Sequence, residues 1–452
     1  MKQIDFSTGS TRKNVAAATF PLLVAQILSL LYSIVDRIYI GRIPDEGTYG
    51  LGGIGLSFPI IMIITAFTNL LGMGGAPLCA IARGRRDTQE ASRILHTSFT
   101  LLILCSFFLF GFFELFAAPA LRLFGASEDM LPHALPYLQI YLLGTPATML
   151  ASGLNPFINA QGYASAGMLT IFIGAVCNII LDPILIFVFH LGIRGAAIAT
   201  VVSQFLSMGF VLLFLHRPQC ELKVRFLPPH SLDPSLVLRI ISVGLTGFIM
   251  QFTNSLVSIV CNKMLSVYGG DLYISIYTII SSIRHILDVP VGAIADGASP
   301  ILSFNYGARR VDRMKETVRL FTTWLVLYTL IIWILILLFP GLFIRIFTSD
   351  PVLLSSGAPA LRIYYFAFVF QAFQYAGQSV FKSLGRTRKA VFFSLLRKVI
   401  IVVPLTLWLP TLQALRVNGV FLAEPISNVI GGSACFITML LTEYRLWSRQ
   451  LH

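Results

Sequence analysis

The sequence predicts an all-α integral membrane protein with twelve transmembrane helices in two six-helix bundles. Composition is the first indication, because 56% of the 452 residues are hydrophobic and only 12% are charged, which is too apolar for a soluble protein. The second is the recurrence, along the whole chain, of apolar stretches long enough to cross roughly 30 Å of hydrocarbon as a helix. The third is a set of landmarks that occurs twice at a nearly constant offset, which indicates two copies of one unit.

The predicted spans are separated by short turns that are polar, basic or rich in glycine. The first span follows a polar start at residues 1–13 with no small-residue cleavage pattern, so we interpret it as a retained helix and not a signal peptide. The only long polar connection, at residues 217–234, contains four prolines and lies between the sixth and seventh spans. The predicted spans are 14–40, 51–77, 94–117, 134–155, 165–189, 193–216, 236–266, 272–300, 318–340, 358–383, 389–412 and 418–443.

The repeated landmarks indicate an internal duplication. Pro77, Gly84, Gly162 and Gly195 match Pro300, Gly307, Gly385 and Gly419, at offsets of 223 for the first three pairs and 224 for the last. Each half has an even number of spans, so both halves start on the same side and are related by a pseudo-two-fold axis along the membrane normal. We predict an amino-terminal bundle at residues 1–216, a cytoplasmic linker at 217–235 and a carboxy-terminal bundle at 236–452, with a substrate cleft where the bundles meet at the midplane.

The formal net charge of +13 is explained by membrane topology and not by nucleic-acid binding. Most Lys and Arg residues lie in the amino terminus, in every second loop and in the carboxy terminus, as the positive-inside rule expects of cytoplasmic segments. We therefore expect a multi-pass protein of the plasma (inner) membrane with both termini in the cytoplasm. One of the basic clusters assigned to the cytoplasm comprises Arg386, Arg388, Lys389, Arg397 and Lys398.

The sequence contains no motif of an ATP-driven pump or of a membrane enzyme. The glycine-rich residues 72–75 are followed by no Lys-Ser/Thr pair, so close helix packing explains them better than phosphate binding. The six cysteines form no CxxC pair, and neither structural disulfides nor zinc sites are expected. We expect no cofactor, and an ion gradient of H⁺ or Na⁺ as the energy source.

Four polar residues of the first half are predicted to lie at similar depth in the outer third of the membrane. Asp36 is near the outer end of the first span, roughly 7 Å inside it. Asp182 lies eight residues before His190 at the outer end of the fifth span, and Asn178 is one turn earlier on the same face. Thr200 lies at similar depth from the same side, in the sixth span. Their carboxylate, amide and hydroxyl oxygens suit a small cation, and we predict that they form a site for H⁺ or Na⁺.

The two acids of this predicted site are confined to one half. At the offset of 223, the counterparts of Asp36 and Asp182 are Ile259 and Leu405. Polar groups of a scaffold tend to recur in both copies of a duplicated unit, whereas an ion site need not. The alternative is that the two acids only bind helix ends or neighbouring backbone.

In the second half, Arg284 and Asp288 are spaced i,i+4 and are expected to pair across one helical turn. Asp296 and Glu424 have no basic residue one turn away, and Glu424 matches Thr200 in the repeat. Ionisable groups inside spans are candidates for function by default, and aromatic rings offer cation–π surfaces. The residues predicted to line the substrate cleft are Tyr32, Asn155, Asn159, Gln251, Asn254, Tyr277, Asp296 and Glu424.

Several segments resemble the multidrug and toxic compound extrusion (MATE) family, and within it a MepA-like bacterial branch. These are residues 35–41, 154–162, 178–183, 195–200, 305–308 and 419–425. The resemblance spans nearly the whole chain and implies cation-coupled antiport, with groups matching Asp36, Asn178, Asp182 and Thr200 forming the cation site. The chain departs from the family pattern in the seventh span, where residues 251–254 lack the glutamate that related proteins often carry.

These observations together predict a secondary active transporter that exports organic, often cationic, small molecules in exchange for H⁺ or Na⁺ by alternating access. The alternative is a lipid or lipid-linked glycan flippase, which would need a basic lining for a phosphate head group. Arg37 and Arg284 are the only basic residues predicted deep in spans, so this alternative is placed second. The expected partners are small-molecule drugs or organic cations and the lipid bilayer, without nucleic acid, and the expected state is a monomer.

Overall fold

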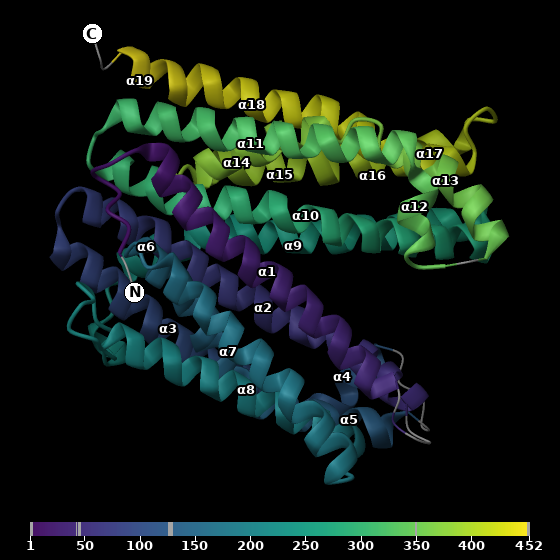
Figure 1. Ribbon diagram of the computed structural model, residues 1–452, viewed down its shortest axis with the longest axis horizontal. Coiled ribbons are helices and arrows are strands. Elements are labelled where there is room, and N and C mark those ends of the chain that lie inside the picture. Colours follow the sequence, from purple (N-terminus) through teal and green to yellow (C-terminus); the bar gives the residue numbers. More distant parts are fainter. Residues whose placement is uncertain (1–2, 42, 44–46, 125–129, 349, 450–452) are drawn as a thin grey trace. The chain divides into compact units, whose positions relative to one another are not determined.

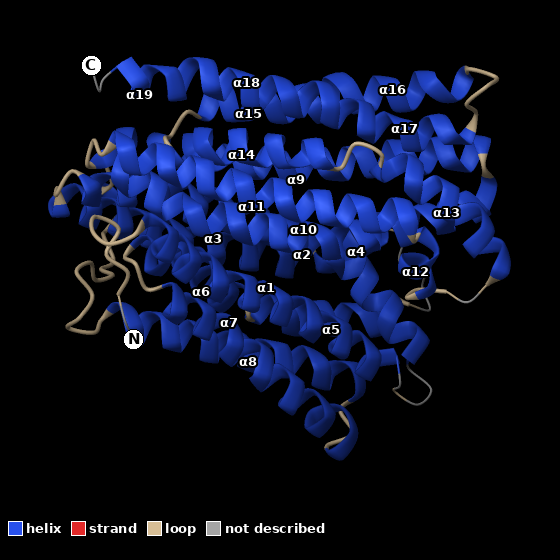
Figure 2. Cartoon of the chain, turned by 45° about the horizontal axis from the view of Figure 1, so that its top comes forward, coloured by secondary structure: helices blue, strands red, loops and turns tan. Residues whose placement is uncertain are grey.

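The computed structural model describes residues 3–41, 43, 47–124, 130–348 and 350–449. Every regular element in these residues is helical and none is a strand, as Figure 2 shows. Ten of the described helices are long and apolar enough to cross a membrane, or up to eleven spans if the bent pair Pro351–Tyr365 and Val369–Ser383 is one span. The predicted all-α membrane fold is confirmed.

The remaining predicted span, 134–155, falls on two shorter helices, α5 (Leu131–Leu143) and α6 (Thr145–Ala160), which follow each other across Gly144. Pro146 lies in the first turn of α6. Because proline has no backbone N–H to continue the ladder of the preceding helix, the interruption has a local cause.

The other elements of the first half are drawn in Figure 1. They are α1 (Thr11–Gly41), α2 (Gly47–Gly84), α3 (Thr88–Leu115), α4 (Ala117–Leu123), α7 (Ala164–Pro183), the π-helical segment η1 (Ile184–Val188) and α8 (Gly192–Leu215). A 3₁₀ turn, η2 (Pro229–Ser231), lies in the long connection that follows.

The helices of the second half are interrupted more often. Its α-helices are α9 (Pro234–Tyr268), α10 (Gly270–Gly307), α11 (Val311–Leu338), α12 (Pro340–Arg345), α13 (Pro351–Tyr365), α14 (Val369–Ser383), α15 (Thr387–Leu395), α16 (Val403–Trp408), α17 (Val417–Ser427), α18 (Ser433–Met439) and α19 (Arg445–Arg449). The intervening segments are the π-helical η3 (Leu396–Val402), η5 (Asn428–Gly432) and η6 (Leu440–Tyr444), and the 3₁₀ turn η4 (Leu409–Thr411).

The element bounds confirm the internal duplication. Helix α10 begins 223 residues after α2 (270 − 47), and α11 begins 223 residues after α3 (311 − 88). The same pairs end at the same offset, at Gly84 and Gly307 and at Leu115 and Leu338. Even the backbone between these helices repeats, because Arg86 and its counterpart Arg309 both have a positive φ, at 62° and 56°.

Contacts divide the chain into two compact units. Unit 1 comprises residues 1–5 and 20–244, and unit 2 comprises residues 6–19 and 245–452. The short segment 6–19 therefore groups with the carboxy-terminal unit, where the ring of Phe6 packs edge-on against Phe304 at 5.8 Å between centroids. The domain boundaries at 216 and 235 stay a prediction.

Small residues allow close helix packing in unit 1. A side chain at Gly72 would collide with the backbone of Gly153 on α6, and one at Gly74 would collide with the backbone of Ile240 on α9. The packing role predicted for residues 72–75 is therefore confirmed for these two glycines.

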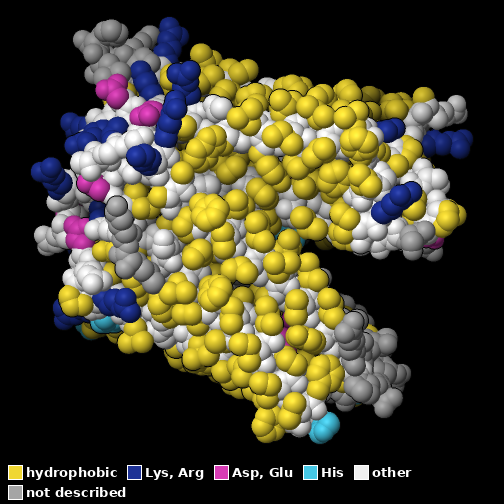
Figure 3. Space-filling model, viewed as in Figure 1, with side chains coloured by type: hydrophobic (Ala, Val, Ile, Leu, Met, Phe, Trp, Pro, Cys, Tyr) yellow, Lys and Arg dark blue, Asp and Glu magenta, His cyan; other side chains and the backbone are white. Residues whose placement is uncertain are grey.

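The surface of each unit fits a bilayer. Figure 3 shows hydrophobic side chains along the helices and Lys and Arg side chains mostly toward helix ends. Large apolar residues such as Phe108 and Leu338 are 67% and 60% exposed, which is unfavourable in water and favourable in lipid. The chain is a multi-pass membrane protein.

Candidate functional site

Three of the four predicted cation-site residues form a hydrogen-bonded cluster between α7 and α8 in unit 1. Asn178 donates from Nδ2 to Asp182 Oδ1 at 3.2 Å and to Thr200 Oγ1 at 3.4 Å. Asp182 is fully buried and Asn178 is 2% exposed. Asp182 and Asn178 are one turn apart on α7, so their side chains leave the helix on one face.

The fourth residue, Asp36 on α1, is the acidic neighbour of Asp182 and lies within hydrogen-bonding reach of it. Two carboxylates this close repel each other unless a proton or a cation lies between them. Asp182 Oδ2 and Asn178 Oδ1 are buried and accept no hydrogen bond from any described residue. The cluster thus presents acceptor oxygens without donors, which is the chemistry of a cation or proton site.

Residues that the sequence argument did not place at this cluster also surround it. Tyr32 on α1 and Tyr137 on α5 both lie within electrostatic range of Asp36 and Asp182. Tyr141 on α5 lies beside Gln204 on α8. Of these residues, only Gln204 could have been predicted from the sequence to lie near the cluster, since it follows Thr200 by one turn on the same face of α8.

Two residues of the predicted cleft lie elsewhere in unit 1 and connect helices. Asn155 on α6 donates to the carbonyl oxygen of Gly167 on α7 at 2.8 Å, and Asn159 donates to Asn155 Oδ1 at 3.1 Å. A side chain at Gly167 would collide with Asn159 Oδ1. The structure gives this asparagine pair a place in the contact of α6 with α7.

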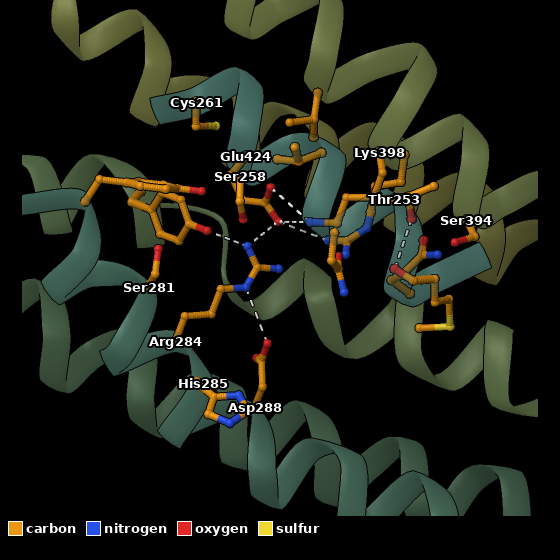
Figure 4. Close-up of a pocket in the computed structure, with 18 of the residues that line it drawn as sticks. Thr253, Ser258, Cys261, Ser281, Arg284, His285, Asp288, Ser394, Lys398 and Glu424 are labelled. Atoms are coloured by element: carbon orange, nitrogen blue, oxygen red, sulfur yellow. Dashed lines mark hydrogen bonds and ion pairs between the residues drawn. The ribbon is translucent and has the colours of Figure 1, made fainter. Parts of the chain in front are cut away.

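Unit 2 contains a cavity of about 260 Å³, shown in Figure 4. Three residues of the predicted cleft, Asn254, Tyr277 and Glu424, line it. Gln251 and Asp296 are not among its lining residues, and Asp296 lies 3.7 Å from Lys382 instead. The cavity therefore brings together part of the predicted set.

Glu424 is the centre of a buried charge network in this cavity. Its Oε1 lies 2.8 Å from Arg284 Nη1, 3.1 Å from Lys398 Nζ and 3.3 Å from Arg397 Nη1. Arg284 also pairs with Asp288 at 3.3 Å, which confirms the predicted i,i+4 pair. Figure 4 shows Arg284 between the two carboxylates.

The prediction that Arg397 and Lys398 belong to a cytoplasmic basic cluster is wrong. They are 7% and 4% exposed and lie in η3, inside the apolar span Thr387–Thr411. The positive-inside rule counts basic residues and takes no account of a buried acidic partner. That partner, Glu424, is 27 residues from Arg397 and 26 residues from Lys398 in the chain, so the sequence gives no local indication of the pairing. Arg284 and Arg37 are consequently not the only basic residues within spans. Lys389 of the same cluster is 36% exposed and pairs with Glu443 at 2.8 Å.

Two of the cations of this network, and an amide that one of them binds, lie on π-helical segments. Arg397 and Lys398 belong to η3, and Asn428, which accepts from Arg397 Nη1 at 2.6 Å, begins η5. In unit 1, η1 follows Asp182 after one proline. Such widened turns re-aim side chains and occur frequently at functional sites.

Comparison with protein families accounts for both units. The model of the MatE family matches residues 21–184 and 248–408, one match for each copy of the repeat. The chain belongs to the MatE family. This MATE assignment confirms the resemblance seen in the sequence and places the protein in a family of transporters.

Two curated relatives of this MATE chain are multidrug export proteins. The multidrug export protein MepA of Staphylococcus saprophyticus subsp. saprophyticus is 24% identical over 452 residues, covering 98% of this chain and 96% of the relative. That of Staphylococcus haemolyticus is 23% identical over 402 residues, covering 88% and 87%. A solved MATE structure in the bent conformation has a TM-score of 0.92 at 21% identity and covers 100% of both chains, which shows that the fold is shared.

Proposed function

We propose that this MATE protein is a secondary active exporter of organic, often cationic, small molecules, driven by exchange for H⁺ or Na⁺. The observation that carries the proposal is the pair of the buried Asp182 and the half-buried Asp36, at which Asp182 Oδ2 and Asn178 Oδ1 accept no hydrogen bond from a described residue. An ionisable pair buried in a membrane protein is costly unless it has a function or a counter-ion.

The coupling follows from the charge of this pair. A proton shared by the two carboxyl groups, or a sodium ion bound by them with Asn178 Oδ1 and Thr200 Oγ1, would remove their repulsion. A gradient performs work only if the ion binds one conformation more tightly than the other. We propose that alternating access exposes the occupied site to different sides, so that ion entry drives release of cargo outside.

The cargo and setting are proposed from the relatives. The two staphylococcal proteins are named as multidrug exporters, which favours export of organic molecules over lipid flipping for this chain. We place the protein in the plasma membrane as a monomer with both termini in the cytoplasm.

The test is the substitution Asp36→Asn, which keeps size and hydrogen bonding but removes one negative charge. Ethidium efflux from cells should be abolished, while the amount of protein in the membrane fraction stays unchanged. The matched control is Asp312→Asn, because Asp312 is exposed in the first turn of α11 and should leave efflux intact. Efflux by Asp36→Asn at the wild-type rate would remove this pair from the mechanism.

The coupling ion is identified in proteoliposomes of the wild-type protein. Ethidium uptake is followed under an imposed pH gradient and, separately, under an imposed sodium gradient. Transport under only one of them identifies the ion, and transport under neither would refute ion-driven exchange.

A further inference from the structure

We propose that the cavity of unit 2 binds an organic anion, a molecule with a carboxylate or phosphate group on an aromatic or apolar body. The inference deepens the proposed function, on which it rests for transport, by adding anionic or zwitterionic molecules to the cargo. Binding itself does not depend on transport and is tested separately.

The charges that line the cavity do not balance. Three cations, Arg284, Arg397 and Lys398, face two carboxylates, Glu424 and Asp288. All three contact Glu424 Oε1, so a single oxygen serves three positive groups. Excess positive charge in a buried site is unfavourable unless a counter-ion is present, and a bound anion would supply it.

Donors for such an anion are available on Arg397. Its hydrogen bonds to Glu424 and Asn428 both come from Nη1. Among the described residues no acceptor is hydrogen bonded to its Nε or Nη2, the edge of a guanidinium that holds a carboxylate or phosphate through two parallel bonds. Lys398 lies beside it with Nζ at 3.1 and 3.3 Å from the two oxygens of Glu424.

The rest of the lining suits the body of such a molecule. Tyr277, Tyr364 and Tyr375 provide ring faces, and Gln378 and Ser281 provide further polar contacts. A volume of about 260 Å³ is near the lower end of the range for small-molecule sites, roughly 300 Å³. The cavity therefore fits a one-ring compound better than a large drug.

The repeat shows that the sign of the charge differs between the units. At the offset of 223, the counterparts of Arg397 and Lys398 are Gly174 and Ala175. The helix that carries Asp182 in unit 1 thus has no cation at these positions, while its copy in unit 2 has two. Unit 1 presents unpaired acceptors and unit 2 presents unpaired donors.

The experiment compares three one-ring probes that differ in charge: benzoate, benzyl alcohol and benzyltrimethylammonium. Binding is measured by titration calorimetry on full-length protein in phosphatidylcholine nanodiscs without any gradient. Benzoate should bind saturably and the other two should not. Lys398→Met should weaken benzoate binding about 10-fold or more, as expected for loss of a charge-assisted contact.

The variant Lys398→Met leaves two cations facing two carboxylates, so its charges balance and it should fold. Lys263→Met is the matched control, because Lys263 is an exposed lysine of α9 outside the cavity lining. Equal binding of benzoate and benzyl alcohol would overturn the proposal. Wild-type affinity for benzoate in Lys398→Met would also overturn it, since the positive charge of Lys398 would then be compensated without a bound anion.

A lipid headgroup could supply the same chemistry as a soluble anion. Repeating the titration in phosphatidylglycerol nanodiscs distinguishes the two sources, because an anionic lipid in the cavity would weaken benzoate binding to the wild-type protein and not to Lys398→Met. Absence of benzoate binding in phosphatidylcholine nanodiscs would refute the anion site. Ethidium efflux is scored independently: efflux without benzoate binding refutes this inference alone, and benzoate binding without efflux refutes the proposed function alone.

Discussion

Buried carboxylates have opposite surroundings in the two units. Asp182 has one oxygen without a donor, whereas Glu424 has both oxygens within reach of cations. The first arrangement leaves room for an added positive charge, and the second has an excess of it. At the scale of residues, the partners of a carboxylate decide its role more than its depth in the membrane does.

Glu424→Gln should strongly destabilise unit 2. Removing one partner of a buried pair leaves unpaired charge behind, at a cost of roughly 3–5 kcal/mol, and here three cations lose their common partner. The measurement is the free energy of unfolding of the purified protein in detergent.

Glu443→Gln is the comparison for that measurement. Glu443 is equally buried, but its partners Arg386 and Lys389 are 45% and 36% exposed and can regain water when the charge is lost. We expect a clearly smaller loss of stability. Equal losses in the two variants would contradict the importance assigned to burial of the cations.

At the scale of elements, two glycines allow a helix of each unit to pack closely against the irregular segment that precedes it in the chain. A side chain at Gly195 on α8 would lie 2.8 Å from the backbone of Leu185 in η1, and its repeat counterpart Gly419 has the same relation to Leu409, at 2.7 Å. Backbone cannot yield as a flexible side chain does, so these positions require glycine for space. The glycine pair Gly195 and Gly419, one of the landmarks that indicated the duplication, is therefore explained by close packing in both units.

Gly195→Ala should lower the yield and melting temperature of folded protein. Gly209→Ala is a matched control on the same helix, because a side chain there meets nothing within 4 Å. In a helix interior alanine is favoured over glycine by roughly 1 kcal/mol, so the control should be neutral or slightly stabilising. Both variants are compared by thermal unfolding in detergent, and a loss at Gly209→Ala equal to that at Gly195→Ala would refute the packing explanation.

At the scale of the whole molecule, duplication produced a common scaffold with different side chains. The long helices α2 and α10 share their bounds at an offset of 223, as do α3 and α11, while acids occupy one copy and mixed charges the other. A scaffold depends on backbone packing and helix length, which tolerate changes of polar residues inside a cavity. Binding chemistry could therefore diverge without loss of the fold.

The even number of predicted spans in each half puts both termini on the same side, and the positive-inside rule assigns that side to the cytoplasm. Green fluorescent protein fused to the carboxy terminus should fluoresce in bacterial cells, because it folds in the cytoplasm, and alkaline phosphatase fused at the same position should be inactive. Active phosphatase at that position would contradict the assignment of the carboxy terminus to the cytoplasm.

The sequence alone determined the membrane class, the repeat and most of the helices, because apolar length and glycine landmarks are local properties of a chain in lipid. It also determined that Asn178, Asp182 and Thr200 converge, since two neighbouring spans joined by a short turn place residues of similar depth side by side. Only the tertiary structure decided that Glu424 meets Arg284, Arg397 and Lys398. These residues come from three helices far apart in the chain, and their meeting depends on the rotation and tilt of packed helices, which hydropathy does not encode.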